Sequence, residues 1–192
     1  MTSPPLRHLP IACARRVRWR NGLGWTREIA RVPDSEDWNW RLSIAEIDQT
    51  APFSRFPGVD RVLVLLSGGG LRLDFEDGPA RTLRVPFEFH RFDGEAGVTG
   101  VLLDGPTCDF NLMWRRGAVD ARLEVVELEG AHTQELAAGE EGAIHLLRGS
   151  ATVGDLLLAE EDTVAIGAQT TAHRVRFEGS GTALLIRIRP RS

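Results

Sequence analysis

The sequence predicts an all-β protein built from short antiparallel strands. Apolar and polar residues alternate in residues 71–75, 121–128 and 184–189, which is the period-two pattern of strands with one buried face. No amphipathic pattern longer than two or three helical turns occurs. Many short strands at close spacing are typical of an antiparallel sandwich or barrel. Glycine-rich segments punctuate the chain as expected for turns between such strands, at residues 67–70, 93–94, 104–106 and 179–181.

A weak internal repeat divides the strands into two units. Residues 61–68 can be aligned with residues 142–149, about 80 residues further along the chain. Each segment is an apolar strand that ends at a glycine. After the second run, residues 159–166 place an acidic turn before an apolar strand. We therefore expect an N-terminal β unit over residues 1–118, which carries the candidate pocket, and a smaller β unit over residues 119–192.

The composition excludes several kinds of chemistry. The chain has 192 residues and a net charge of −4, which disfavours nucleic-acid binding. Its 23 basic residues are all arginine, so no lysine can form a Schiff base, and tyrosine is absent as an acid, base or nucleophile. Cys13 and Cys108 lack Cys-x-x-Cys spacing, and we expect reduced thiols, although a single disulfide between them stays open.

Nothing in the sequence indicates a membrane protein. The N-terminus has no apolar segment of the kind that signal peptides carry. The apolar run at residues 62–66 is far too short to span a bilayer. We expect a cytoplasmic protein with neither a membrane nor a nucleic acid as its partner.

Polar residues stand among aromatic residues in segments that otherwise look like strands, and the first example is residues 40–45. Charged groups in buried strands cost free energy unless they are paired or contact a ligand. Arg41 and Ser43 share one strand face with Ala45, and these small neighbours leave space beside the arginine. We interpret Arg41 and Ser43 as facing the barrel interior. The alternative places Arg41 in solvent and Trp40 in the core.

Two further segments add polar candidates. In residues 19–28, Asn21 precedes a glycine bend that brings the backbone close to another group, so Asn21 is either a pocket contact or part of a plain turn. In residues 109–116, alternation places Asp109 and Asn111 on one face, opposite an apolar face. Asn111 offers both a donor and an acceptor, and Asp109 could hold the fork of an arginine. The alternative is a surface pair of Asp109 with an arginine.

These segments together resemble the HutD/Ves family of bacterial bicupin proteins. The resemblance rests on residues 19–28, 40–45 and 53–61, on the Asp-x-Asn-x-Met pattern from Asp109, and on the Pro-Phe-x-Phe run at residues 86–89. It implies a bicupin fold, with two cupin-like antiparallel β-barrels or sandwiches packed together. Members of this family are associated with histidine utilisation or stress response. Their N-terminal pocket is thought to bind a small acidic metabolite, such as formylglutamate.

The cupin metal motif is missing from both halves. Cupins usually carry His-x-His, then a Glu and, after six further residues, a Gly. Counting back from Gly68 places Arg61 at the Glu position, and counting back from Gly149 places Gly142 there. No histidine occupies the other ligand positions in either half. Because a metal site needs several converging nitrogen or oxygen ligands, we expect no metal and no cofactor.

An arginine at the metal-ligand position converts a cation site into an anion site. The planar fork of Arg61 suits a carboxylate. Phe56 is expected to form an apolar wall or lid over the bound ligand. His90 follows the Pro-Phe-x-Phe run, but the family usually continues with Gly-Asp soon after, and here residues 90–93 intervene before Gly94. His90 is therefore either a proton carrier near neutral pH or a structural residue.

The leading hypothesis is a metal-independent protein that binds a small carboxylate from histidine utilisation, such as formylglutamate, in a regulatory or sensing role. One rival is an isomerase or hydrolase of small acids that uses His90 or Asp109. A second rival is a protein–protein adaptor, and pairing of sheet edges into a homodimer stays open. The residues expected to bind the ligand are Asn21, Arg41, Ser43, Phe56, Arg61, His90, Asp109 and Asn111.

Overall fold

The computed structural model describes residues 4–19 and 22–191 and confirms the all-β prediction. The chain forms two compact β units. The N-terminal unit is Arg15–Ala118, and the C-terminal unit combines Met1–Ala14 with Val119–Ser192. The single helical element among the described residues is a 3-10 turn, η1, at Ile11–Cys13. No helix in this part of the chain is therefore long and apolar enough to cross a membrane.

The sequence predicts an N-terminal unit over residues 1–118, whereas the compact N-terminal unit of the structure begins at Arg15 and ends at Ala118. In the structure β1 (Leu6–Leu9) pairs antiparallel with β15 (Thr163–Ile166). The backbone groups of β1 are therefore satisfied by the C-terminal sheet, which places the start of the chain in the C-terminal unit. Local sequence carries no signal for a pairing between strands so far apart along the chain.

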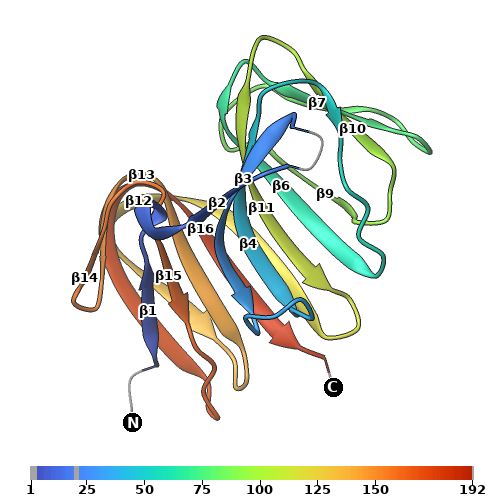
Figure 1. Ribbon diagram of the computed structural model, residues 1–192. Helices are drawn as coiled ribbons and strands as arrows, with labels where there is room; N and C mark the ends of the chain where they lie inside the picture. The colour runs from blue at the N-terminus through green and yellow to red at the C-terminus, as the bar shows by residue number, and fades with distance from the viewer. Residues whose placement is uncertain (1–3, 20–21, 192) are drawn as a thin grey trace. The chain divides into compact units, whose positions relative to one another are not determined.

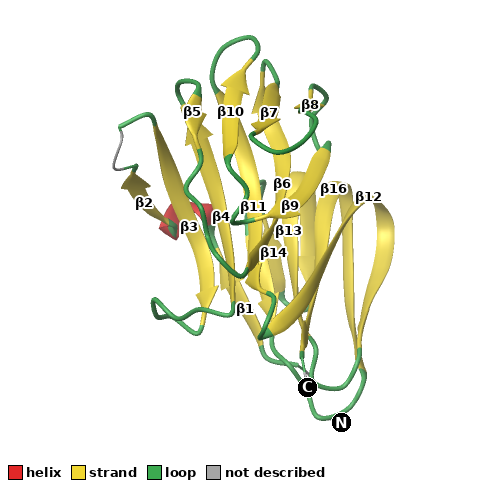
Figure 2. Cartoon of the chain, turned by 90° about the vertical axis from the view of Figure 1, so that its right-hand side faces the viewer, coloured by secondary structure: helices red, strands yellow, loops and turns green. Residues whose placement is uncertain are grey.

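The N-terminal unit contains a sheet of six strands and a sheet of four. Figure 2 shows β5, β10 and β7 of the smaller sheet side by side. The strands of the larger sheet, in spatial order, are β2 (Arg15–Arg18), β3 (Gly24–Val32), β4 (Trp40–Ile47), β11 (Thr107–Arg115), β6 (Val59–Gly68) and β9 (Phe89–Asp93). Those of the smaller sheet are β5 (Ala51–Pro52), β10 (Val98–Leu102), β7 (Leu71–Phe75) and β8 (Arg81–Leu83).

The C-terminal unit is built on one sheet, in which the long strands β12 and β16 run side by side (Figure 1). Glycines at 179 and 181, expected in a turn, lie inside β16 instead. A Cβ on Gly181 would come within 2.0 Å of the carbonyl oxygen of Arg148, so glycine is required here by the close approach of β13. The strands in spatial order are β1, β15, β13 (Glu141–Val153), β16 (His173–Pro190) and β12 (Val119–Leu136), with β14 (Leu156–Leu158) paired to β13.

The internal repeat appears as the same β-bulge in both units. The pairing of β6 with β11 skips Leu66, and the pairing of β13 with β16 skips Leu147. These two residues are equivalent in the sequence repeat. A bulge inserts one extra residue and re-aims the side chains around it. The equivalence of the two units thus extends from sequence to register.

The turn that leads into β9 and the turn that leads into β15 repeat as well. Phe87 and Glu161 are the only described non-glycine residues with positive φ, at 75° and 66°. The Phe87 amide donates to the Leu65 carbonyl and the Glu161 amide donates to the Leu146 carbonyl, each at 2.7 Å. Such backbone conformations cost free energy and persist where surrounding hydrogen bonds enforce them. The acidic turn expected within residues 159–166 thus has a counterpart with the same backbone geometry, but not the same acidic sequence, in the N-terminal unit.

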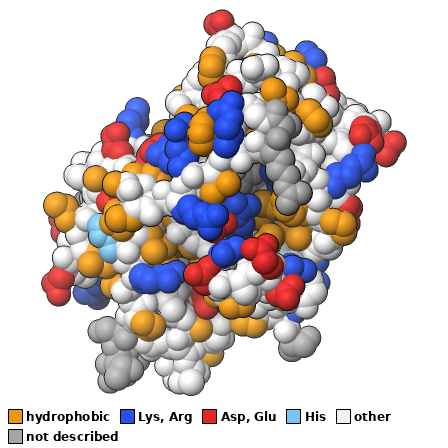
Figure 3. All heavy atoms as spheres, in the orientation of Figure 1, with side chains coloured by type: hydrophobic (Ala, Val, Ile, Leu, Met, Phe, Trp, Pro, Cys, Tyr) orange, Lys and Arg blue, Asp and Glu red, His pale blue; other side chains and the backbone are white. Residues whose placement is uncertain are grey.

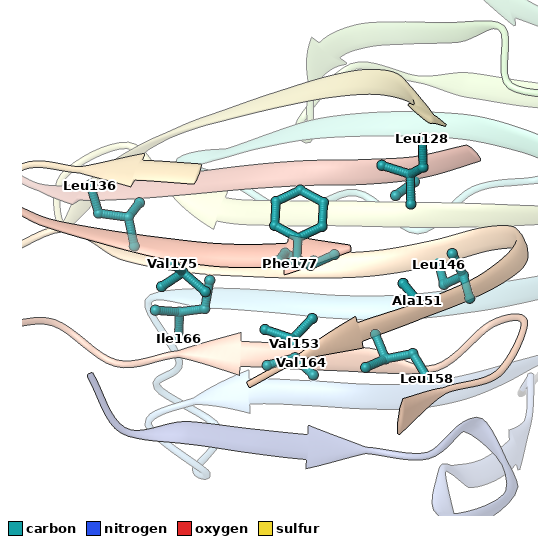
Figure 4. Packing of buried hydrophobic residues seen from close by; sticks show 12 residues of the cluster. Leu128, Leu136, Leu146, Ala151, Val153, Leu158, Val164, Ile166, Val175 and Phe177 are labelled. Atoms are coloured by element: carbon teal, nitrogen blue, oxygen red, sulfur yellow. The ribbon is translucent and has the colours of Figure 1, made fainter. Parts of the chain in front are cut away.

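Each unit has its own apolar core. In the C-terminal unit Phe177 and Val175 of β16 pack with Val153 of β13 and Val164 of β15, as Figure 4 shows. The core of the N-terminal unit consists of interior side chains of both its sheets. Its buried members are Ala45, Ile47, Leu63, Leu65, Leu71, Leu73, Leu83, Phe92 and Val98.

Candidate functional site

Three adjacent strands of the N-terminal unit place the candidate residues on one side of the sheet. In the ladder of β11 with β4, Asn111 is opposite Ser43 and Met113 is opposite Arg41. In the ladder of β11 with β6, Met113 is opposite Arg61. Residues directly opposite in antiparallel strands project to the same face, so the two arginines flank Met113. The period of two along each strand therefore brings these side chains together.

This face lines a cavity of about 480 Å³ within the N-terminal unit, a size usual for small-molecule sites. Five of the residues expected to bind the ligand line it. They are Arg41, Ser43, Phe56, Arg61 and Asn111. The rest of the lining comes from Arg18, Trp19, Thr26, Ala45, Pro52, Phe53, Ser54, Leu63 and Met113.

Arg61 is a buried cation without an anionic partner in the described part of the chain. The residue is 7% exposed, and its Nη2 donates to Oδ1 of Asn111 at 2.8 Å. Its Nε is buried and has no hydrogen-bond acceptor among the described residues. No described carboxylate lies within 4.0 Å of its guanidinium nitrogens. The guanidinium is therefore able to accept a further anion.

Aromatic rings surround the Arg61 guanidinium. Its Cζ lies 5.4 Å from the ring centre of Phe53, 5.9 Å from that of Phe56 and 5.0 Å from that of Phe92. Each ring face attracts a cation, which partly replaces the water lost on burial. Rings carry no net charge, however, so they do not supply a counter-ion.

The charge in this cavity is positive at neutral pH. Burial, and to a lesser extent the charge of Arg41, lowers the pKa of Arg61 to about 10. That value is still far above pH 7, so Arg61 stays protonated. All charged residues in the lining are arginines, Arg18, Arg41 and Arg61. The cavity therefore has the electrostatics of an anion site.

Arg41 differs from Arg61 because it has a carboxylate partner. Its Nε donates to Oε2 of Glu28 at 2.8 Å, and both side chains are about one-fifth exposed. Glu28 lies 3.6 Å from Arg31 as well. The contact with Glu28 uses the Nε edge of Arg41 and leaves its terminal nitrogens for a second acceptor.

Many arginines elsewhere pair with carboxylates, and Arg61 is the only buried arginine among the described residues. Because the chain contains no lysine, every blue side chain in Figure 3 is an arginine, and on this face they lie among red carboxylates. The nearest nitrogen–oxygen distance is 2.7 Å between Arg72 and Asp74 and 2.8 Å between Arg174 and Glu135. Such exposed ion pairs contribute little to the free energy of folding, but they give these arginines the counter-charge that Arg61 does not have among the described residues.

His90, an expected ligand contact, does not line the cavity. It is opposite Leu63 in the β6–β9 ladder, and its ring contacts Phe75 at 5.8 Å and stacks on Phe92 at 6.3 Å. Burial, followed by the charge of Arg81, lowers the pKa of His90 below its usual value. The imidazole is therefore neutral at pH 7 and packs as an aromatic ring.

Asp109 does not line the cavity and does not hold an arginine. It is fully buried, and its Oδ2 accepts a hydrogen bond from the hydroxyl of Thr107 at 2.9 Å. Its Oδ1 has no hydrogen-bond partner among the described residues. Burial raises the pKa of Asp109 to about 7, although the hydrogen bond from Thr107 opposes the rise. The expected arginine pair is absent because Asp109 is opposite Leu65, four residues along β11 from the position that faces Arg61.

Asn21 lies outside the described residues. Nine lining residues, among them Arg18, Leu63 and Met113, are not among the residues that the sequence predicts to bind the ligand. Strict alternation places Leu63 on the face of Arg61 and Met113 on the face of Asn111, but an apolar side chain gives no sign that it lines a ligand cavity. Arg18 follows two other arginines in β2, and nothing in the sequence distinguishes it from them.

The described residues contain no ready metal site. No three His, Cys, Asp or Glu side chains among them gather as ligands. Cys13 and Cys108 are free thiols. The cavity itself is lined by arginines, whose charge would repel a metal cation.

Comparison with known proteins places these observations in a family. The family model described as HutD matches residues 12–185. Protein Ves of Cronobacter sakazakii is 39% identical over 144 residues, which cover 74% of this chain and 77% of that protein. An uncharacterized 21.2 kDa protein from the hutC 3′ region of Pseudomonas putida is 40% identical over 111 residues, which cover 57% of this chain and only 58% of that protein.

A solved structure shows the same fold over the full length. The structure of HutD from Pseudomonas fluorescens SBW25, in a formate condition, has a TM-score of 0.89 and 27% sequence identity. The match covers 98% of this chain and 100% of that chain. It confirms the bicupin fold expected from the sequence.

Proposed function

The chain belongs to the HutD family, and from this premise we propose that its N-terminal pocket binds a small carboxylate metabolite without a metal ion. The observation that carries the proposal is the isolated charge of Arg61. Leaving a buried cation without a counter-charge is strongly unfavourable. A carboxylate ligand would supply that charge and accept hydrogen bonds from the unused edge of the guanidinium.

The other lining residues have complementary roles in this proposal. Arg41 would supply a second cation through the nitrogens that Glu28 leaves free. Ser43 and Asn111 would orient the ligand, since a hydroxyl and an amide both donate and accept hydrogen bonds. Phe56 would cover the ligand and exclude water, which strengthens the ionic contact.

The family suggests the ligand's origin. One matched relative is a HutD structure determined in a formate condition, and another is encoded in a hutC 3′ region. We therefore place the ligand among the acidic intermediates of histidine utilisation, with formylglutamate as the leading example. The physiological role would be to sense or buffer that metabolite.

A binding role is favoured over catalysis by the chemistry of the lining. Apart from arginines, none of the described residues that line the cavity titrates. General acid–base catalysis needs a titratable group within hydrogen-bond reach of the substrate. His90, Asp109 and Glu28, the candidates for an enzymatic mechanism, all lie outside the lining.

The test is a thermal-shift screen with urocanate, formiminoglutamate, formylglutamate, glutamate and formate. A ligand at a hundred times its Kd should stabilise the folded protein by about 2.7 kcal/mol. The shift should vanish in Arg61→Met, which removes the charge and keeps most of the volume. The matched control Arg55→Ala removes an exposed arginine that pairs with Glu76, and it should keep the shift. No shift with any compound, or an equal shift in Arg61→Met, would refute the proposal.

A further inference from the structure

We propose that Gly100 sets the largest carboxylate that the pocket admits, and that it acts through Phe53. This inference rests on the proposed function, because it assigns a size limit to the ligand of the same pocket. Phe53 forms part of the wall, and Gly100 lies behind that wall. Gly100 would thus be a specificity-determining residue that never touches the ligand.

Phe53 has a fixed backbone and a ring that contacts three different groups. Its amide donates to the carbonyl of Val98 at 2.8 Å, which ties the residue to β10. Its ring meets Trp19 edge to face, with centroids 6.4 Å apart. The ring centre lies 5.4 Å from Cζ of Arg61. The position of this ring therefore helps to decide how much of the cavity remains for the part of a ligand beyond the group bound to Arg61.

Gly100 provides the slot into which the far edge of that ring fits. A Cβ built on Gly100 would lie 2.7 Å from both Cε1 and Cζ of Phe53. Real Cβ contacts are longer than 3.0 Å, and ordinary van der Waals contact begins near 3.4 Å. Even a methyl group at this position therefore overlaps the ring.

The need for glycine here comes from space and not from backbone conformation. Gly100 is absent from the glycines with positive φ, so an alanine could adopt its backbone conformation. It sits inside the regular pairing of β10 with Leu73 of β7 and with Ala51 of β5. Glycine inside a strand weakens the strand and often marks a close approach of another group. The group that approaches Gly100 is the ring of Phe53.

A side chain at Gly100 would push the ring into the cavity. Restoring normal contact requires the ring to move by roughly 1 Å, since 2.7 Å must become about 3.4 Å or more. The backbone of Phe53 is held by Val98, so the movement falls on the side chain. Trp19 contacts the ring edge to face, and the ring also lines the cavity, so a displaced ring takes up cavity space that a longer ligand would need.

The displaced ring should change the affinity of a large ligand more than the affinity of a small one. The carboxylate head contacts Arg61 and Asn111, whose strands do not include Gly100. Formate consists of that head alone, whereas glutarate extends beyond it towards the wall. One methylene that fits poorly in a pocket changes discrimination by about tenfold or more. We therefore expect Gly100→Ala to lower glutarate affinity about tenfold and to change formate affinity less than twofold.

The experiment is calorimetric titration of formate and glutarate into four proteins: the wild type, Gly100→Ala, Phe53→Leu and the double variant. Phe53→Leu removes the ring, so adding Gly100→Ala to it should have no further effect on the ratio of the two affinities. The matched control is Gly117→Ala, since a Cβ on Gly117 meets no atom within 4 Å. It should leave both affinities unchanged.

The outcomes distinguish this inference from the proposed function. If the wild type binds both acids and Arg61→Met binds neither, but Gly100→Ala keeps the wild-type ratio, the role of Gly100 is refuted and the carboxylate site stands. If the wild type binds neither acid, the size limit assigned to Gly100 is refuted, and the thermal-shift screen decides the carboxylate site separately. Should Gly100→Ala not fold, Phe53→Leu alone decides, because a wider slot should improve glutarate binding relative to formate. An unchanged ratio in Phe53→Leu would overturn the inference.

Discussion

The pH dependence of stability offers a sharp test of the interior of the N-terminal unit, through the substitution Asp109→Asn. Asp109 is fully buried, and its one hydrogen bond among the described residues comes from Thr107. Burial raises its pKa from 3.8 to about 7. Asparagine keeps the shape and the acceptor for the Thr107 hydroxyl but cannot ionise.

The direction in which stability changes with pH follows from the protonation of Asp109 in the folded and the unfolded chain. Below the unfolded pKa of 3.8 the carboxyl is protonated in both states, and its contribution to stability is fully present. As the pH rises towards 7, the unfolded chain ionises while the folded protein must hold the proton, so the wild type loses stability. Above the folded pKa of about 7 the loss is complete. Asp109→Asn does not undergo this loss.

The magnitude can be worked from the pKa difference. A rise from 3.8 to about 7 is about three pH units, and each is worth about 1.4 kcal/mol. The stability of the variant relative to the wild type should therefore grow by about 4 kcal/mol at most between pH 4 and pH 8. Between pH 5 and pH 6 the difference should change by about 1 kcal/mol.

Urea unfolding of both proteins at pH 5, 6, 7 and 8 measures this difference. A constant offset from the asparagine amide does not matter, because only the change with pH is predicted. Other titrating groups, including His90, are the same in both proteins and cancel. If the stabilities of the two proteins stay parallel from pH 5 to pH 8, Asp109 is ionised in the folded protein and the assignment of its pKa to burial is wrong.

Two further predictions follow from single contacts. Glu28→Gln removes the negative charge beside Arg41, and a nearby exposed charge contributes about 1 kcal/mol to the binding free energy. Glutarate should therefore bind about fivefold tighter at low salt, and 0.5 M salt should reduce this gain. Weaker binding in calorimetry would show instead that Glu28 positions Arg41. Asp162→Asn weakens the hydrogen bonds from His8 and Ile11 that hold β1. The free energy of unfolding, measured with urea at pH 7, should fall by about 1–3 kcal/mol. An unchanged urea midpoint would contradict a stabilising role for these hydrogen bonds.

Much of the pocket could be predicted because a strand has a period of two. Once residues 40–45 and 109–116 are taken as strands, Arg41 and Ser43 must share a face, and so must Asp109 and Asn111. What alternation does not give is the register between strands. Asp109 is opposite Leu65 and not Arg61, and this offset of four residues, about 13 Å along a strand, removed the expected ion pair.

The remaining differences come from long-range contacts. The pairing of β1 with β15 depends on atoms more than 150 residues apart in the chain, and the four residues of β1 have no pattern that specifies their partner. His90 was considered as a proton carrier because a histidine titrates near neutral pH. In the structure the His90 ring packs against Phe75 and Phe92 and does not line the cavity. That packing arises only when β7 and β9 come together.

The two units provide an internal comparison that bears on the role of Arg61. The shared bulge makes Leu66 equivalent to Leu147, so the counterpart of Arg61, five residues before the bulge, is Gly142. By the same register, the counterparts of Asp109 and Asn111 are Ala183 and Leu185, which belong to an apolar core. The C-terminal unit therefore folds without a charged side chain at these three positions.

Folding alone thus does not explain the polar residues of the N-terminal unit. Burial lowers the pKa of Arg61 to about 10, and this corresponds to a cost of about 3 kcal/mol for holding the cation in that interior. Asn111 offsets part of this free-energy cost by accepting one hydrogen bond from Arg61, and the surrounding aromatic rings offset a further part of the cost. A carboxylate bound beside Arg61 would restore the missing counter-charge and return the pKa towards its ordinary value. The cost of Arg61 in the free protein then becomes a contribution to affinity in the complex, which the C-terminal unit, with Gly142 in its place, has no means to make.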